Sequence, residues 1–264
     1  MPNRTPETAA QPEEVAIGFR SHPKTSRKIL SLLGDDFAGK KILDLGAGPG
    51  AFTQALFERI QSTGPDPQEI VTACDLFPDD FRFAGTECRQ MNFNKRFPLD
   101  DASFDVVVSI EVIEHLSDQF HFIREVARIT RPGGRAFITT PNILNANGRF
   151  RFFFTGTWPL FDALPVAAHD VTGVPGHIGA ISLYYIYYFA MRAGFHTCRF
   201  HIDRVKRSAA LLAPFIWAGS RLVTPKMNRK RAREGTLDDN RAALEALNSF
   251  PTLVGRTVIV EAIK

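Results

Sequence analysis

Residues 43–53 read LDLGAGPGAFT, and this segment is the clearest indication of the fold class. It begins inside an apolar run, residues 40–46 (KKILDLG), which is typical of a buried parallel strand. It ends inside residues 50–62 (GAFTQALFERIQS), whose apolar side chains recur at helical spacing. A strand, a glycine-rich turn and a helix in direct succession open a βαβ unit, so the sequence predicts an α/β fold.

The turn between this strand and helix holds three alternating glycines, Gly46, Gly48 and Gly50. Glycine accepts positive φ angles and lets the backbone approach a ligand closely. The N-terminus of the following helix adds free N–H groups and a partial positive charge. In the dinucleotide-binding pattern a third glycine would stand at Ala51, and Pro49 suits a ligand without a pyrophosphate. The turn therefore predicts a binding site for a ligand other than a dinucleotide.

Beyond the turn, strand and helix patterns alternate along the chain. Helices are expected at residues 24–37, 118–134 and 182–195, the second one stopped by Pro-Gly-Gly. Further strands are expected at residues 69–76, 87–93, 103–110, 135–142, 197–205 and 256–264. This order predicts a doubly wound, Rossmann-like, mostly parallel seven-stranded sheet.

The domain organisation follows from where this rhythm breaks. Residues 1–23 are polar and predict a flexible N-terminal arm, and residues 24–264 predict one domain. Within it, the Phe-, Gly- and Pro-rich segment 143–176 predicts a lid insertion. The apolar and basic segment 206–256 predicts a late helical insertion before the last strand.

Composition places the chain in the soluble globular class, with 264 residues, 44% hydrophobic and 23% charged. Its three cysteines have no disulfide or metal spacing, which favours a reducing, cytoplasmic compartment. The N-terminus has no apolar signal region, and no stretch reaches the roughly 18 apolar residues of a membrane span. These features predict a protein that does not cross a membrane.

The positive charge gathers in one late segment. Residues 201–233 carry nine Lys and Arg against the single acid Asp203. Since that segment is +8 and the whole chain is +4, the remainder is −4. An apolar stretch (residues 209–223) precedes the basic cluster, and this pattern suits a helix lying in an anionic membrane interface. The stretch is too short, and too broken by Pro214, to span a membrane. A packed helix with a solvated basic loop, or a surface for RNA phosphates, are the alternatives.

Acidic residues and a histidine follow the ends of two predicted strands. Asp75 ends the second strand, where a carboxylate can accept both hydroxyls of a ribose. Glu111, Glu114 and His115 follow the fourth strand directly. If residues 111–116 form a helical turn, the three side chains share one face and can form a hard-cation site. In the alternative interpretation, Glu111 lies beside the ligand, Glu114 is solvated and His115 caps or packs.

In these residues and in the segments between them, the chain resembles the class I S-adenosylmethionine-dependent methyltransferases. The resemblance rests on residues 43–50, on Asp75, and on the segments 97–116 (FPLDDASFDVVVSIEVIEHL), 131–134 (RPGG) and 140–142 (TPN). It implies that S-adenosylmethionine is the cofactor, that loop 44–50 holds its methionine part and that Asp75 takes the ribose. It also implies an adenine contact at Asn92. The implied cofactor-binding residues are Asp44, Gly46, Ala47, Gly48, Gly50, Asp75, Leu76, Asn92, Phe93 and Ile110.

The segment EVIEHL (residues 111–116) also resembles two narrower families. In small-RNA 2′-O-methyltransferases, a Glu-x-x-Glu-His group and a later histidine bind a divalent metal, and ubiquinone-pathway O-methyltransferases carry a similar group. The later histidine here is His177, with His169 as the other candidate. The resemblance implies that a divalent cation such as Mg²⁺ is held by Glu111, Glu114, His115 and His177. Without a metal, His115 or His177 is expected to be the general base, with Glu111 beside the reaction.

The aromatic residues after position 148 allow two interpretations. Five Phe and a Trp lie within residues 149–164, and four Tyr and a Phe within residues 183–189. They either pack the core and lid or line an acceptor cleft for an apolar, aromatic or sugar group.

The sequence therefore predicts O-methylation of a hydrophobic, lipid-linked or sugar hydroxyl acceptor at the inner face of a membrane, contacted through residues 209–233. The alternatives are a metal-dependent RNA 2′-O-methyltransferase and a non-catalytic domain that binds the cofactor.

Overall fold

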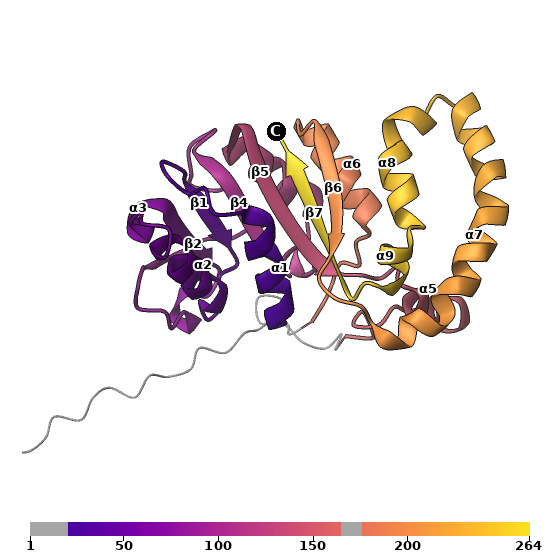
Figure 1. Ribbon diagram of the computed structural model, residues 1–264, viewed down its shortest axis with the longest axis horizontal. Coiled ribbons are helices and arrows are strands. Elements are labelled where there is room, and N and C mark those ends of the chain that lie inside the picture. The colour runs from indigo at the N-terminus through magenta and orange to yellow at the C-terminus, as the bar shows by residue number, and fades with distance from the viewer. Residues whose placement is uncertain (1–20, 165–175) are drawn as a thin grey trace, which may run out of the picture.

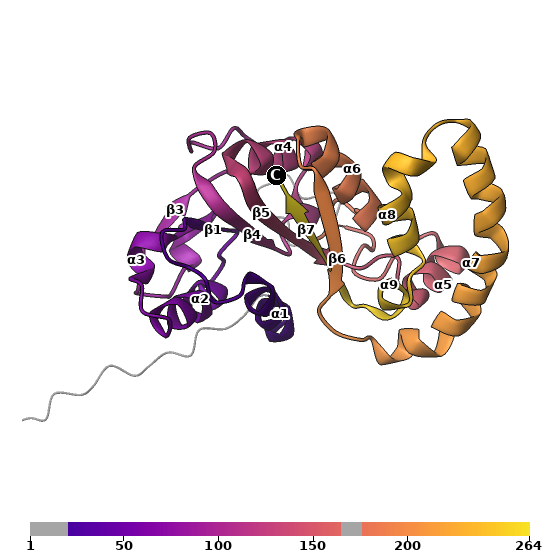
Figure 2. The same cartoon turned by 45° about the horizontal axis from the view of Figure 1, so that its top comes forward.

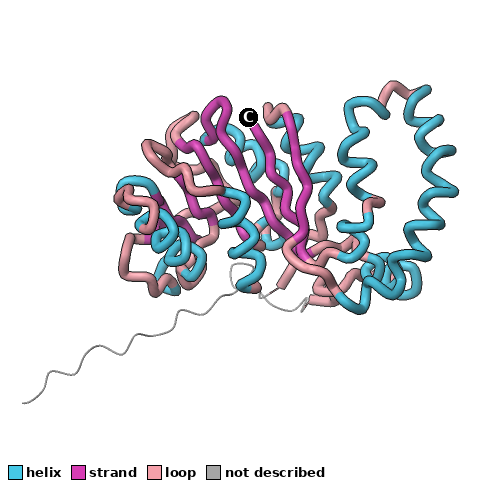
Figure 3. The backbone as a smooth tube through the Cα atoms, viewed as in Figure 1, coloured by secondary structure: helices cyan, strands magenta, loops and turns pink. Residues whose placement is uncertain are grey.

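The computed structural model describes residues 21–164 and 176–264 of the chain. Its centre is one seven-stranded sheet with the order β3-β2-β1-β4-β5-β7-β6. Figure 3 shows the strands of this sheet in magenta, with helices in cyan around them. β7 runs antiparallel to both of its neighbours, and the remaining pairs are parallel, which confirms the predicted sheet. The strands are β1 (Ile42–Leu45), β2 (Val71–Asp75), β3 (Cys88–Gln90), β4 (Phe104–Ile110), β5 (Thr130–Pro141), β6 (Thr197–Ile202) and β7 (Thr257–Ile263).

Helices cover both faces of the sheet, so the core has two halves (Figures 1 and 2). Side chains of β4 alternate between them: Val106 and Val108 pack with one half, and Val107 packs with the other. The first half is completed by α1 (Pro23–Leu33), α2 (Ala51–Gln61) and the short α3 (Pro67–Ile70). The second half is completed by α4 (Gln119–Ile129) and α6 (Leu183–Ala193).

The centre of the sheet brings the glycine turn and the acidic segment together. β1 pairs with β4 in parallel, with Leu45 opposite Ser109, so both strands end at the same edge. From β1 the chain continues outward to β2 and β3, whereas β4 leads to β5 on the other side. Ligands of open α/β sheets bind at such a reversal point, beyond the carboxyl ends of the strands.

Two predicted boundaries differ from the structure. α4 ends at Ile129 rather than at the Pro-Gly-Gly turn, because the residue before Pro132 disfavours helical geometry and Thr130 is already extended. The predicted lid contains a helix, α5 (Ala146–Thr155), which its Phe- and Gly-rich composition does not indicate. Asn145 caps it by accepting the N–H of Gly148 at 2.9 Å. Residues 165–175, including His169, and most of the predicted N-terminal arm lie outside the described residues.

The late insertion is helical, as predicted, and protrudes from one edge of the sheet (Figure 1). It comprises α7 (Arg207–Arg233), α8 (Leu237–Leu247) and α9 (Phe250–Val254). The expectation that Pro214 breaks the first helix is wrong, since α7 continues through Pro214 and Pro225. Both prolines are exposed, while Ala209 and Ala213 are buried and anchor the helix. Within the described residues, no helix combines the length and apolarity that a membrane crossing needs.

Candidate active site

The glycine turn after β1 is held tightly against its neighbours. The N–H groups of Gly46 and Ala47 donate to the carbonyl of Cys74, at 2.8 and 3.1 Å. Gly46 has φ +84°, and a Cβ added there would lie 2.2 Å from Cγ2 of Val112. Gly48 and Gly50 also have positive φ, at +53° and +93°. A side chain at Gly46 would thus push apart the turn after β1 and the segment after β4.

Asp75 joins this turn to the end of β2. One carboxylate oxygen accepts the N–H of Gly48 at 2.8 Å, and the other accepts that of Phe77 at 2.9 Å. Each oxygen keeps a second lone pair, so the carboxylate can still accept the hydroxyls of a ribose. The neighbouring Asp44 is buried and accepts the hydroxyl of Thr53 at 2.7 Å. Burial raises the pKa of Asp44 to about 7, against the effect of that bond and with a smaller contribution from Asp75.

The remaining predicted cofactor residues lie along the same edge of the sheet. Ala47 and Ile110 are buried beside the ends of β1 and β4, and Leu76 directly follows β2. Asn92 is exposed just beyond β3, and its side-chain oxygen accepts the N–H of Asn94 at 3.0 Å. Phe93 turns into the core, where its ring packs edge-on against other Phe rings. Contact of these residues with the cofactor stays a prediction.

Glu111 does not share a face with Glu114 and His115, so that expectation is wrong. Glu111 adopts a left-handed conformation with φ +55°, and the 3₁₀ turn η2 (Ile113–His115) begins only after it. Its carboxylate accepts the hydroxyl of Thr257 at 3.3 Å, at the start of β7. Burial raises the pKa of Glu111 above its ordinary value, and the Thr257 bond opposes this. The carboxylate therefore stands apart from the other predicted ligands.

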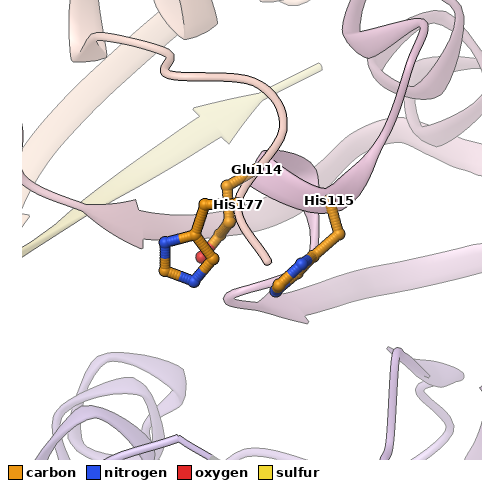
Figure 4. Close-up of side chains that lie close together, drawn as sticks. All are labelled: Glu114, His115 and His177. Atoms are coloured by element: carbon orange, nitrogen blue, oxygen red, sulfur yellow. The ribbon is translucent and has the colours of Figure 1, made fainter. Parts of the chain in front are cut away.

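Glu114, His115 and His177 do come together (Figure 4). One potential ligand atom from each residue lies within 4.8 Å of those of the other two. The first two come from η2, and His177 comes from the segment before α6. The N–H of Gly179 donates to the Glu114 carbonyl at 3.0 Å and so fastens that segment to η2. We call these three residues the acid–histidine cluster.

Burial governs the charges within the acid–histidine cluster. Glu114 is 0% exposed, and neither carboxylate oxygen has a hydrogen-bond partner among the described residues. Burial raises the pKa of Glu114 to about 8, so the acid is mostly neutral at pH 7. Burial likewise lowers the pKa of His177, and the neighbouring His115 adds to this effect. Nδ1 of His115 lies 2.8 Å from the Gly176 carbonyl, so we assign the proton to Nδ1, which leaves the Nε2 lone pair free.

The acid–histidine cluster fits a divalent cation. Glu114 offers a buried carboxylate without a partner, and Nδ1 of His177 is likewise buried and unpartnered within the described part of the chain. Two imidazoles and one carboxylate suit a transition metal such as Mn²⁺ or Zn²⁺ better than Mg²⁺, which prefers oxygen ligands. Three of the four predicted ligands are thus close together, and Glu111 is the exception.

Gln119 is a positioning residue that the sequence does not single out. Its side-chain amide donates to the carbonyls of Ile113 and Gly179, at 3.0 and 2.9 Å. It thereby holds η2 and the His177 segment together from the first position of α4. The only sequence signal is that it closely follows the acidic segment.

Comparison with known proteins agrees with this geometry. Residues 43–138 match the methyltransferase domain family. A ubiquinone biosynthesis O-methyltransferase of Pseudomonas aeruginosa is 32% identical over 149 residues, covering 55% of this chain and 63% of that protein. The corresponding protein of Pseudomonas fluorescens is 31% identical over 151 residues, covering 56% and 64%. The chain thus spans less than two thirds of the length of these relatives.

Solved structures share the fold over nearly the whole chain. An S-adenosylmethionine-dependent methyltransferase from Archaeoglobus fulgidus superposes with a TM-score of 0.55 at 14% identity, covering 91% of this chain and 93% of that one. Another from Mesorhizobium loti gives 0.51 at 17% identity, covering 90% and 96%. The domain match, the relatives and the fold together show that the chain carries a class I S-adenosylmethionine-dependent methyltransferase domain.

Proposed function

We propose that the protein transfers the methyl group of S-adenosylmethionine to a hydroxyl oxygen of a hydrophobic, lipid-linked or sugar acceptor. The observation that carries this proposal is the acid–histidine cluster, which follows β4 on the edge of the sheet that also carries the glycine turn. The curated relatives, named as O-methyltransferases of ubiquinone biosynthesis, support oxygen as the methylated atom.

The proposed chemistry needs a base more than it needs an activated methyl group. The sulfonium of S-adenosylmethionine already makes the methyl carbon electrophilic, whereas a protonated hydroxyl is a poor nucleophile. In our proposal Nε2 of His115 removes the hydroxyl proton as the oxygen attacks the methyl carbon, and the cofactor leaves as S-adenosylhomocysteine. The Gly176 carbonyl fixes the tautomer that this role requires. His177, a neutral second imidazole, would orient the hydroxyl.

A divalent cation held by the acid–histidine cluster is the alternative to His115 as general base. Glu114, His115 and His177 would hold it, and it would lower the pKa of the bound acceptor hydroxyl. Undiminished methyl transfer in EDTA would exclude this alternative. Loss of transfer in EDTA with recovery on adding Mn²⁺ or Zn²⁺ would establish it.

We further propose that the protein works at the inner face of an anionic membrane, which it contacts through α7. Leu211, Phe215 and Leu222 lie on one side of this helix and are 76%, 77% and 83% exposed. Lys226, Arg229 and Arg233 continue the same side toward the C-terminus. An apolar strip followed by cations suits an anionic lipid interface. A lipid-linked acceptor would be met there.

The experiment that tests the proposed function follows a labelled methyl group. Purified protein is incubated with methyl-tritiated S-adenosylmethionine and either a bacterial lipid extract or total RNA. We expect label in the organic phase and none in RNA. Label in RNA alone would favour the RNA 2′-O-methyltransferase alternative. Cofactor binding without label in any fraction would favour the non-catalytic one.

A further inference from the structure

The described structure contains a cavity of about 460 Å³ against the inner side of the late insertion. This volume is within the range of sites that bind small organic molecules. Its walls come from the segment after β5, from the start of α6 and from α7 and α8. The residues used below are Leu144, Trp158, Ser182, Tyr184, Arg231 and Leu247.

The cavity lies on the ligand side of the sheet. Leu144 follows the carboxyl end of β5, which runs parallel to β4 and so ends at the same edge. Ser182 caps α6, and the segment leading to it contains His177 and the Gly179 N–H that bonds to Glu114. The chain segment that carries His177 therefore leads directly into one wall of the cavity.

Apolar and aromatic side chains make up most of the lining. Trp158 lines the cavity and stacks on Phe152 with ring centroids 4.2 Å apart, and an indole in such a wall can pack against a ligand ring. Arg149 fixes two of the walls, since its Nε donates to the Leu144 carbonyl at 2.8 Å and its Nη2 to the Leu247 carbonyl. The space thus suits a ring or a branched apolar group.

Arg231 places a positive charge in the cavity wall, and no acidic side chain among the described residues pairs with it. It is half-buried in the cavity wall on the side of α7 that faces the body. Its one hydrogen bond to a side chain within the described residues goes to the neutral amide of Asn228, at 3.0 Å, and it has no ion pair there. The other cations near the end of this helix differ: Lys230 pairs with Glu234, and Arg229 and Arg233 are exposed. A half-buried guanidinium facing an apolar space favours an anionic ligand group.

We propose that this cavity binds the methyl acceptor and selects an amphipathic anion. The acceptor has an aromatic or branched apolar body against Trp158 and Tyr184, and a carboxylate or phosphate on Arg231. This inference rests on the proposed function, because it takes the occupant to be the molecule that is methylated. It adds the charge of the substrate, which neither the relatives nor the fold indicate.

Trp158 allows binding to be tested directly. The chain has two tryptophans, so Trp217→Phe leaves Trp158, in the cavity wall, as the single tryptophan, which is excited selectively at 295 nm. The probes are 4-butylbenzoate, 4-butylphenyl phosphate and the neutral 4-butylbenzamide, each titrated without cofactor. We expect saturable fluorescence changes, with at least one anion binding about tenfold more tightly than the amide. Which anion binds better distinguishes a carboxylate from a phosphate acceptor.

Two matched variants distinguish the contribution of the Arg231 charge to probe binding from that of apolar packing. Arg231→Gln should abolish the preference for anions while leaving the binding of the amide unchanged, and Arg229→Gln, outside the cavity, should change neither. Each bound anion should also inhibit label transfer competitively against the lipid extract. No saturable binding of any probe, or an anion preference that survives Arg231→Gln, would overturn the inference. So would binding without inhibition.

The cofactor provides the separate readout for the proposed function. Calorimetric titration with S-adenosylmethionine is made on the same protein. Cofactor binding without probe binding would overturn the cavity assignment alone. Probe binding without cofactor binding would overturn the proposed function instead.

Discussion

For single residues, the sequence indicates which side chains belong to the site better than it indicates where each side chain points. The family resemblance names Glu114, His115 and His177 as ligands of one site, and the structure brings these three side chains together. The resemblance misplaces Glu111, because a non-glycine residue with φ +55° has no reliable signal in a single sequence. One left-handed residue turns its carboxylate toward Thr257 and leaves three predicted ligands instead of four.

The glycine turn provides a matched pair of substitutions. Gly46 and Gly39 both have positive φ, but an added Cβ meets Val112 at Gly46 and nothing within 4 Å at Gly39. Gly39→Ala should cost roughly 1 kcal/mol of unfolding free energy from backbone strain. Gly46→Ala should cost about 1–3 kcal/mol more and abolish cofactor binding. Urea unfolding and calorimetry measure the two effects, and equal behaviour of both variants would contradict the tight packing of the turn.

The buried Glu114 predicts a pH dependence of stability. Its folded-state pKa, raised to about 8, exceeds its ordinary value of 4.5, so its contribution to stability is complete below about pH 4.5 and is lost as the pH rises through 8. Glu114→Gln removes this loss, which we expect to be up to about 5 kcal/mol. Urea titrations from pH 5 to pH 9 should give a flatter profile for the variant, although Asp44 retains its own slope. Parallel profiles would contradict the raised pKa of Glu114.

The proposed base makes a third prediction at this scale. His115→Ala should lower the rate of label transfer by about 10²–10⁴ while leaving cofactor affinity unchanged. His196→Ala is the matched control, because His196 is exposed and precedes β6 at the opposite edge of the sheet. A His115→Ala variant with the control's rate would remove this residue from the reaction.

At the element scale, α7 shows how tertiary contacts override a local signal. Each proline removes a backbone hydrogen bond and costs on the order of 3 kcal/mol inside a helix. Burial of Ala209 and Ala213 nevertheless holds the first turns against the body, and the helix continues to Arg233. A hydrogen bond of 2.6 Å from Asn147 to Ser208 joins it to α5. These partners lie far away in the sequence, so the sequence alone could not show them.

The outer side of α7 makes a prediction about membranes. We expect the protein to sediment with vesicles of phosphatidylcholine and phosphatidylglycerol, and less so as salt increases. Replacing both Phe215 and Leu222 by Ser should abolish binding, because these side chains form the exposed apolar strip. Val223→Ser is the matched control, since Val223 is 56% exposed but lies on another side of the helix. Equal binding of the double variant and the control would contradict contact through this strip.

At the scale of the whole molecule, hydrophobic periodicity carries most of the fold. Buried parallel strands such as residues 106–110 and amphipathic helices such as α4 leave clear patterns, and the seven predicted strands are all present. The cavity could not be predicted in this way. Leu144, Ser182 and Arg231 meet there from three parts of the chain, and only the packing of the late insertion against α5 and α6 brings them together.

The most direct test of the proposed function is a calorimetric titration of the purified protein with S-adenosylmethionine. We expect one cofactor per chain, competition by S-adenosylhomocysteine, and at least tenfold weaker binding in Asp75→Ala, because this change removes both the proposed ribose acceptor and the bond to Gly48. Wild-type protein that gives no binding heat and no competition, while remaining folded by circular dichroism, would contradict it.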